Sequence, residues 1–128
     1  MSLPSGEATD VAMTAGEALT DSTYRYYNVT RDTGTRTVKI AGAGEKVFGI
    51  LQVGGADGAE VTVRTDGFSY NIIADGTSTI DDYLISDADG KGTVSTTTKG
   101  EVYAKVFDAS TAANDIVVVQ IQKFTLST

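Results

Sequence analysis

Two stretches of the sequence carry the same pattern of strands and turns. In the first, Val-Phe-Gly-Ile-Leu at residues 47–51 is followed by Val-Thr-Val at residues 61–63. In the second, Val-Tyr-Ala-Lys-Val at residues 102–106 is followed by Ile-Val-Val at residues 116–118. The later apolar run starts 14 residues after the earlier one in both stretches, and the stretches lie 55 residues apart. Each stretch therefore predicts a β-hairpin whose connection is rich in small residues.

Two interpretations of this internal similarity stay open. It is a chance likeness between two hairpins, or it marks a pseudo-symmetric barrel or sandwich built from two related halves. A solenoid is excluded, because solenoids need about three or more repeats to be stable.

Further strand-like segments recur about every 8 to 12 residues, a spacing typical of sandwiches and barrels. They cover residues 24–30, 36–40, 70–74, 83–85 and 92–95. Pairs such as Asp66-Gly67 predict turns between them, because Gly adopts a positive φ at no steric cost. The most apolar run, residues 116–121, is expected to be a central strand covered on both faces at its start. The fold class expected is all-β: a small single-domain β-barrel or sandwich of short antiparallel strands.

The start of the chain gives a weaker signal. A helix over residues 9–20 is disfavoured because Gly16 lies in the middle of a mixed pattern. We therefore expect a flexible, extended N-terminal arm over residues 1–20 and a β-barrel or sandwich domain over residues 21–128. The first ten residues have neither the basic nor the apolar region of a signal peptide, and no apolar run approaches the roughly 20 residues of a membrane span.

Composition narrows the possible functions. The 128-residue chain has no His and no Cys, which removes the commonest general base, the commonest metal ligand and all thiolate chemistry. Its net charge of −7 argues against a nucleic acid partner. Its Ser and Thr side chains have no His to activate them. We expect a protein that is not an enzyme and that binds no cofactor, no metal, no nucleic acid and no membrane.

Three acidic or Gly-rich motifs favour ordinary turns over ligand sites. Residues 87–92 resemble the start of a calcium loop, but Thr98 stands where such a loop needs its bidentate Glu. Asp81 and Asp82 are adjacent, so on a strand they would point to opposite faces. Residues 42–46 lack the Gly-Lys-Ser/Thr ending of a phosphate loop.

Tyr24, Tyr26 and Tyr27 form an aromatic cluster. On a strand, Tyr24 and Tyr26 would share one face and Tyr27 would take the other. Packing in the core or on the sheet is the simpler interpretation. The functional alternative is contact with a protein partner or stacking on a sugar, since Tyr is enriched at such surfaces.

From about Ala15 onward, the order of elements resembles the phage capsid cement (head decoration) family. The segments that carry the resemblance are an Ala-Gly-acid segment at 15–19, strands at 24–29 and 37–40, hairpins at 47–63 and 100–121, a Gly bounded by short strands at 67–73, and a Ser-Asp-x-x-Gly-Lys turn at 86–91. The sequence departs from the family at Ala104 and at Ala113-Asn114, where members often have Gly.

The resemblance implies a capsid decoration protein. Such a protein is made in the host cytoplasm, binds the outer surface of the expanded head, and stabilises contacts between major capsid protein subunits. It implies self-association as well, as a trimer or alternatively a dimer. The alternative is a carbohydrate-binding or adhesion β-domain of a phage fibre or cell surface, which would use Tyr24, Tyr26 or Tyr70. The candidate capsid-contact residues are Leu3, Val11, Met13, Tyr24 and Tyr26.

Overall fold

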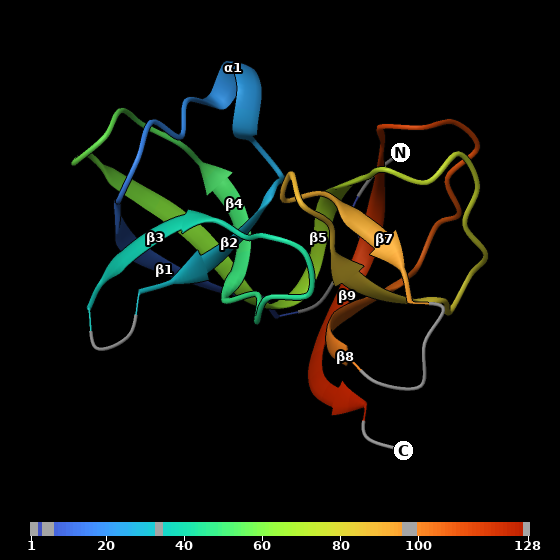
Figure 1. The fold of residues 1–128 in the computed structure, drawn as a ribbon. Coiled ribbons are helices and arrows are strands. Elements are labelled where there is room, and N and C mark those ends of the chain that lie inside the picture. The colour runs from blue at the N-terminus through green and yellow to red at the C-terminus, as the bar shows by residue number, and fades with distance from the viewer. Residues whose placement is uncertain (1–2, 4–6, 33–34, 96–99, 127–128) are drawn as a thin grey trace.

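The computed structural model describes residues 3, 7–32, 35–95 and 100–126 (Figure 1). In these residues the chain forms nine strands and one short helix. They are β1 (Thr9–Ala15), α1 (Asp21–Tyr24), β2 (Asn28–Arg31), β3 (Thr37–Ile40), β4 (Gly49–Val53), β5 (Glu60–Ile73), β6 (Tyr83–Ser86), β7 (Gly92–Val94), β8 (Gly100–Val106) and β9 (Asp115–Leu126).

The strands close into two five-stranded rings that share β5. The first ring runs β1-β3-β2-β4-β5 and closes because β1 also pairs with β5. The second runs β5-β7-β6-β8-β9 and closes because β9 also pairs with β5. We call these rings the N-terminal barrel and the C-terminal barrel, and Figure 1 shows them side by side with β5 between them. The expectation of an all-β barrel is confirmed, although two pairings, β1–β3 and β5–β7, are parallel.

The two barrels repeat one another in detail. Taking β1 to β5 as equivalent to β5 to β9, every pairing in the first ring recurs in the second with the same direction. The N–H of Tyr26 donates to Leu51 O at 2.8 Å, and 55 residues later the N–H of Asp81 donates to Val106 O at 2.8 Å. Tyr26 and Asp81 also share a positive φ, of 69° and 73°. The chain therefore has two related halves, but each half closes a barrel of its own around the shared β5 instead of forming part of a single barrel or sandwich.

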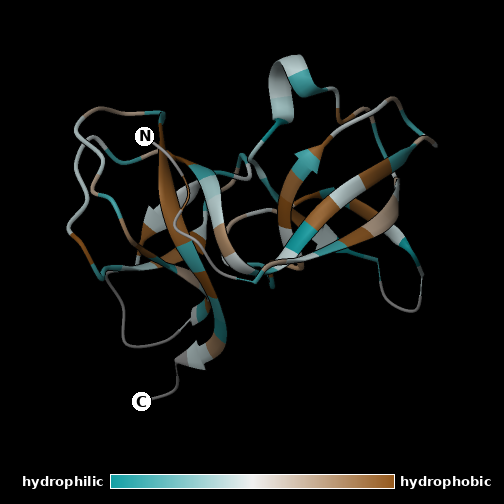
Figure 2. Cartoon of the chain, turned by 180° about the vertical axis from the view of Figure 1, so that it is seen from behind, coloured by the Kyte–Doolittle hydropathy of each residue, from teal (hydrophilic) through white to brown (hydrophobic). Residues whose placement is uncertain are grey.

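Each barrel holds its own hydrophobic core, and Figure 2 shows hydrophobic segments, coloured brown, in the strands of both rings. The N-terminal core contains Met13, Ala15, Leu19, Val29, Val38, Leu51, Val61 and Val63. The C-terminal core contains Ala41, Val47, Ile50, Ile73, Leu84, Tyr103, Ala104, Val106, Val117, Val119 and Ile121. Because successive strand residues point to opposite faces, β4 places Ile50 in one core and Leu51 in the other. One strand thus helps to fill both barrels.

The predicted turn at Asp66-Gly67 is a bend inside one long strand. β5 runs unbroken for 14 residues from the first barrel into the second. Gly67 has a φ of +88°, and a Cβ at this position would lie 2.5 Å from the Glu7 carbonyl oxygen. Only Gly fits here without strain, so it lets the strand change direction and keep its pairing partners.

The prediction of a flexible arm over residues 1–20 is wrong for residues 9–19. β1 is a wall of the N-terminal barrel, lying between β3 and β5. Met13, Ala15 and Leu19 are buried in its core. Val11, Met13 and Ala15 do alternate along the sequence, but the small Ala side chains make that period-2 signal faint. Residues 1–2 and 4–6 lie outside the described residues.

Two further expectations are corrected. The strand expected over residues 24–30 begins only at Asn28, because the chain first forms the short helix α1. The Asp21 carboxylate anchors this helix by accepting a hydrogen bond from the N–H of Gly54 at 2.7 Å. The start of β9 is not covered on both faces, since Ile116 is 47% exposed; burial begins at Val117.

A candidate binding cleft between the two barrels

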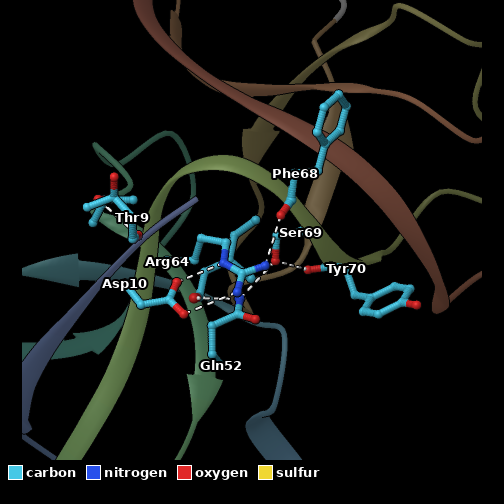
Figure 3. A network of polar contacts seen from close by, with 9 residues as sticks. Thr9, Asp10, Gln52, Arg64, Phe68, Ser69 and Tyr70 are labelled. Atoms are coloured by element: carbon cyan, nitrogen blue, oxygen red, sulfur yellow. Dashed lines mark hydrogen bonds and ion pairs between the residues drawn. The ribbon is translucent and has the colours of Figure 1, made fainter. Parts of the chain in front are cut away.

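A polar network joins the barrels at the bend in β5 (Figure 3). The Arg64 guanidinium forms a two-bond ion pair with Asp10 of β1, at 2.7 and 3.1 Å, and also donates to Phe68 O at 3.0 Å. Beside it, the Gln52 amide donates to the Ser69 hydroxyl at 2.8 Å. The Asp10 hydrogen bond raises the pKa of Arg64, with partial burial opposing it, because the contact with Asp10 favours the charged guanidinium. These contacts fix the angle between the two halves of β5.

A second, buried network crosses the same junction. The Tyr103 hydroxyl of β8 donates to the Asn71 side-chain oxygen of β5 at 2.5 Å. The Asn71 amide nitrogen donates to the Asn28 side-chain oxygen of β2 at 3.0 Å. All three side chains are at most 1% exposed. Since a buried polar group is costly without a partner, this chain of bonds favours one arrangement of the barrels.

A cleft of about 470 Å³ opens between the barrels so joined. We call it the inter-barrel cleft. Its N-terminal wall comes from β2 and the segment leading into β4, and its C-terminal wall from β8 and the end of β9. The lining residues are Thr30, Arg31, Lys46, Val47, Phe48, Glu101, Val102, Lys123, Phe124 and Thr125.

Phe48 lies at the centre of the cleft's contacts. The Arg31 guanidinium lies 5.6 Å and the Lys123 ammonium 5.3 Å from the centroid of its ring, both within cation–π range. Lys123 also donates a hydrogen bond across the cleft to the Phe48 carbonyl oxygen. Partial burial lowers the pKa of Lys123, and the charge of Asp66 offsets some of that effect. The cleft therefore combines an aromatic surface with concentrated positive charge.

The five candidate contact residues do not form one surface. Met13 is buried in the N-terminal core, so it is not available to a partner. Val11 and Tyr24 are half-buried against that same core. Tyr26 is half-buried against the other core, and Leu3 is half-buried near the chain start.

The aromatic cluster is also divided. Tyr24 belongs to α1, whereas Tyr26 is in a left-handed backbone conformation just after it, so the two do not share a strand face. Tyr24 packs edge-on against Tyr27, and Tyr26 packs edge-on against Tyr70. Tyr24 and Tyr27 line a second hollow, of about 380 Å³. Packing explains most of this cluster.

The acidic motifs behave as turns. The Asp87 carboxylate accepts hydrogen bonds from the N–H groups of Asp89 and Lys91, both at 2.9 Å, which closes a tight loop before β7. Among the described residues, no group of three or more acidic side chains gathers closely enough to hold a metal ion. The same residues include no helix of the length and hydropathy needed to span a membrane. Thr98 lies outside the described residues.

The cleft residues were not identified from the sequence. Arg31, Lys46 and Lys123 are widely separated along the chain, and each looks like an ordinary surface cation beside a strand. Their convergence depends on the β5 bend and on how the barrels join. The one local signal is Lys46-Val47-Phe48, where a cation adjoins an aromatic residue.

Comparison with known proteins finds similarity at the level of fold. No protein-family model matches the chain, and no curated protein sequence matches it. Among solved structures, the N base of head fiber gp8.5 in bacteriophage phi29 is similar, with a TM-score of 0.67 and 12% sequence identity. The similarity covers 95% of this chain and 100% of that chain. At this identity, what the two proteins share is the fold, over nearly the whole of both chains.

Proposed function

We propose that this chain is a structural protein of a phage head, and more specifically a decoration protein on the outer surface of the expanded capsid. The observation that carries the proposal is the similarity to a phage head fiber base over 95% of this chain. It agrees with the independent resemblance of the sequence to the capsid cement family. The absence of His and Cys fits a role in binding rather than in catalysis.

The proposed partners are the major capsid protein and further copies of this chain. Binding to the mature lattice only would stabilise that lattice by mass action. Self-association as a trimer would let each copy bind weakly, because attachment at several points raises the effective concentration. A dimer is the alternative, and light scattering on the purified protein distinguishes the two by mass.

Cosedimentation with expanded, undecorated heads of the phage that encodes the chain tests the proposal. We expect saturable binding at a fixed ratio to capsid subunits, and no binding to unexpanded procapsids, which serve as the control. Failure to bind either shell, with circular dichroism showing a folded β-protein, would refute it.

The carbohydrate-binding alternative has less support. Tyr24, Tyr26 and Tyr70 would have to present ring faces to a sugar, but Tyr26 and Tyr70 pack edge-on against each other at 5.4 Å. The chain also has no Trp, the best stacking surface for a sugar. Saturable tyrosine fluorescence changes with glycans, together with failure of cosedimentation, would favour this alternative.

A further inference from the structure

The inter-barrel cleft is a local concentration of positive charge on an acidic protein. The chain carries 10 basic residues against 17 acidic ones, yet Arg31, Lys46 and Lys123 all line this one cleft. Among the described residues that line it, Glu101 is the single carboxylate, and both of its oxygens lie 3.1 Å from the Thr125 hydroxyl. The cleft thus has an excess of cations over the anions available inside it.

In the part of the chain that the structure describes, these three cations form no ion pair with a carboxylate, although the charge of Asp66 acts on Lys123 from outside the cleft lining. The ion pairs there join Lys39 to Asp32, Arg64 to Asp10 and Lys105 to Asp81, all outside the cleft. Arg31 donates to the Thr35 carbonyl and Lys123 to that of Phe48, which are neutral acceptors. Lys123, which lies over the Phe48 ring and is partly desolvated, gains more from an incoming anion than a fully solvated cation does.

Part of the cleft lining is apolar. Val47 and Val102 line the cleft and are buried, with 6% and 3% exposure. Phe48 is half-buried, and Phe124 is 37% exposed with its ring edge-on to Tyr83 at 5.0 Å. A ligand that matches the cleft therefore carries apolar side chains as well as negative charge.

The end of β9 offers backbone hydrogen-bonding groups beside the cleft. β8 pairs with β9 as far as Leu126, but β5 pairs with it only as far as Ile121, where β5 bends away at Gly67. From residue 122 to 126, one edge of β9 consequently has no partner strand in the described segments. Side chains of this stretch, Lys123 to Thr125, line the cleft. An open strand edge accepts an added strand from another protein.

We propose that the inter-barrel cleft binds an extended acidic segment of a partner protein, which adds to the free edge of β9 and places carboxylates among Arg31, Lys46 and Lys123. Apolar side chains of the segment, alternating with the acidic ones, lie on Phe48 and Phe124. The inference goes beyond the proposed function, because it rests on the cleft alone and holds for any partner with this chemistry.

A peptide fits these features better than other polyanions do. The net charge of −7 repels a nucleic acid backbone at long range. A short acidic segment in the cleft interacts mainly with the nearby cations, because salt screens the more distant charges. A sugar acid would need hydroxyl partners, but the Thr30 hydroxyl already donates to Lys46 O and the Thr125 hydroxyl to Glu101. Neither a nucleic acid nor a sugar uses a strand edge.

The test is a nuclear magnetic resonance titration of the ¹⁵N-labelled full chain with a blocked hexapeptide of alternating Glu and Phe. We expect saturable shift changes centred on Arg31, Phe48 and Lys123, and affinity that falls several-fold between about 50 and 300 mM salt. The same peptide with Gln in place of Glu should bind about tenfold more weakly or not at all. Equal binding of both peptides, or shifts centred elsewhere, would overturn the inference.

Matched variants separate the cleft from general surface charge. Lys46→Gln with Lys123→Gln should weaken peptide binding about tenfold or more, whereas Lys39→Gln with Lys105→Gln removes the same charge outside the cleft and should not. Lys46→Gln alone, at an exposed position, provides the test if the double variant is poorly folded. Equal losses in the two double variants would refute the role of the cleft.

Two further results would identify the class of ligand and separate this inference from the proposed decoration role. Saturable binding of an oligogalacturonate at the cleft, without binding of the peptide, would replace the peptide proposal with a sugar-acid site. Peptide binding by a protein that fails to cosediment with heads leaves this inference standing and refutes the decoration role. Cosedimentation without peptide binding would refute this inference and leave the decoration role standing.

Discussion

Replacing Tyr103 by Phe removes one hydroxyl from the buried junction between the barrels. That hydroxyl donates to the Asn71 side-chain oxygen at 2.5 Å, and Tyr103 is 1% exposed, so water cannot replace the lost bond easily. An unsatisfied buried acceptor costs about 1–3 kcal/mol. With an unfolding entropy of about 2.1 cal/mol/K per residue over 128 residues, this loss lowers Tm by about 4–11 °C.

The assay is thermal unfolding followed by circular dichroism, with Tyr27→Phe as the matched control. Tyr27 is half-buried, and its hydroxyl has no hydrogen bond within the described residues, so its loss should change stability by less than about 0.5 kcal/mol. A Tm change for Tyr103→Phe below about 2 °C, or equal to that of the control, would refute the role assigned to this network.

The pH dependence of the same variant gives a second check. Burial raises the pKa of Tyr103 above its ordinary value, so the folded protein keeps the phenol neutral where the unfolded chain ionises it. The stability contributed by Tyr103 is thus complete below about pH 10 and is lost as the pH rises further, by up to about 1.4 kcal/mol per pH unit. The advantage of the wild type over Tyr103→Phe should shrink accordingly in urea titrations above pH 10.

Three other changes test the fold. Gly67→Ala should lower Tm by at least about 5 °C through backbone strain and its clash, whereas Gly76→Ala, whose Cβ would meet nothing within 4 Å, should not. Leu51→Ala and Leu84→Ala, one in each core, should each cost about 2–5 kcal/mol in a single urea transition; two transitions would contradict the shared strand. Backbone N–H groups lower the pKa of Asp115, so the advantage of the wild type over Asp115→Ala should shrink progressively as the pH falls below about 4.

The sequence allowed the hairpins to be predicted because their signals are local. The first hairpin, residues 47–63, includes β4 and the start of β5, which pair with each other. The second, residues 102–118, includes most of β8 and the start of β9, which also pair. The two hairpins are similar because the two barrels have the same topology. The unbroken β5 could not be predicted in this way. Asp-Gly normally ends a strand, and only the approach of residues 7 and 8 to Gly67 shows that here it bends one.

The inter-barrel cleft could not be predicted from sequence patterns for a different reason. Its cations come from β2, from the segment before β4 and from β9, and Lys123 of β9 follows Lys46 by 77 residues. What brings them together is the angle between the barrels, set by Arg64, Asn71 and Tyr103. None of these three residues is part of a recognisable motif.

The shared strand has a consequence for how this chain can be divided. Two complete five-stranded units would need ten strands, and the described part of the chain closes both rings with nine. Neither half is therefore a module that could be moved into another protein or produced alone. A fragment ending before β5 would leave one edge of β1 and one edge of β4 unpaired. A fragment starting after β5 would leave one edge of β7 and one edge of β9 unpaired. Unpaired strand edges are prone to pair with other chains. Insertions and fusions belong in exposed loops, where they leave residues 60–73 intact.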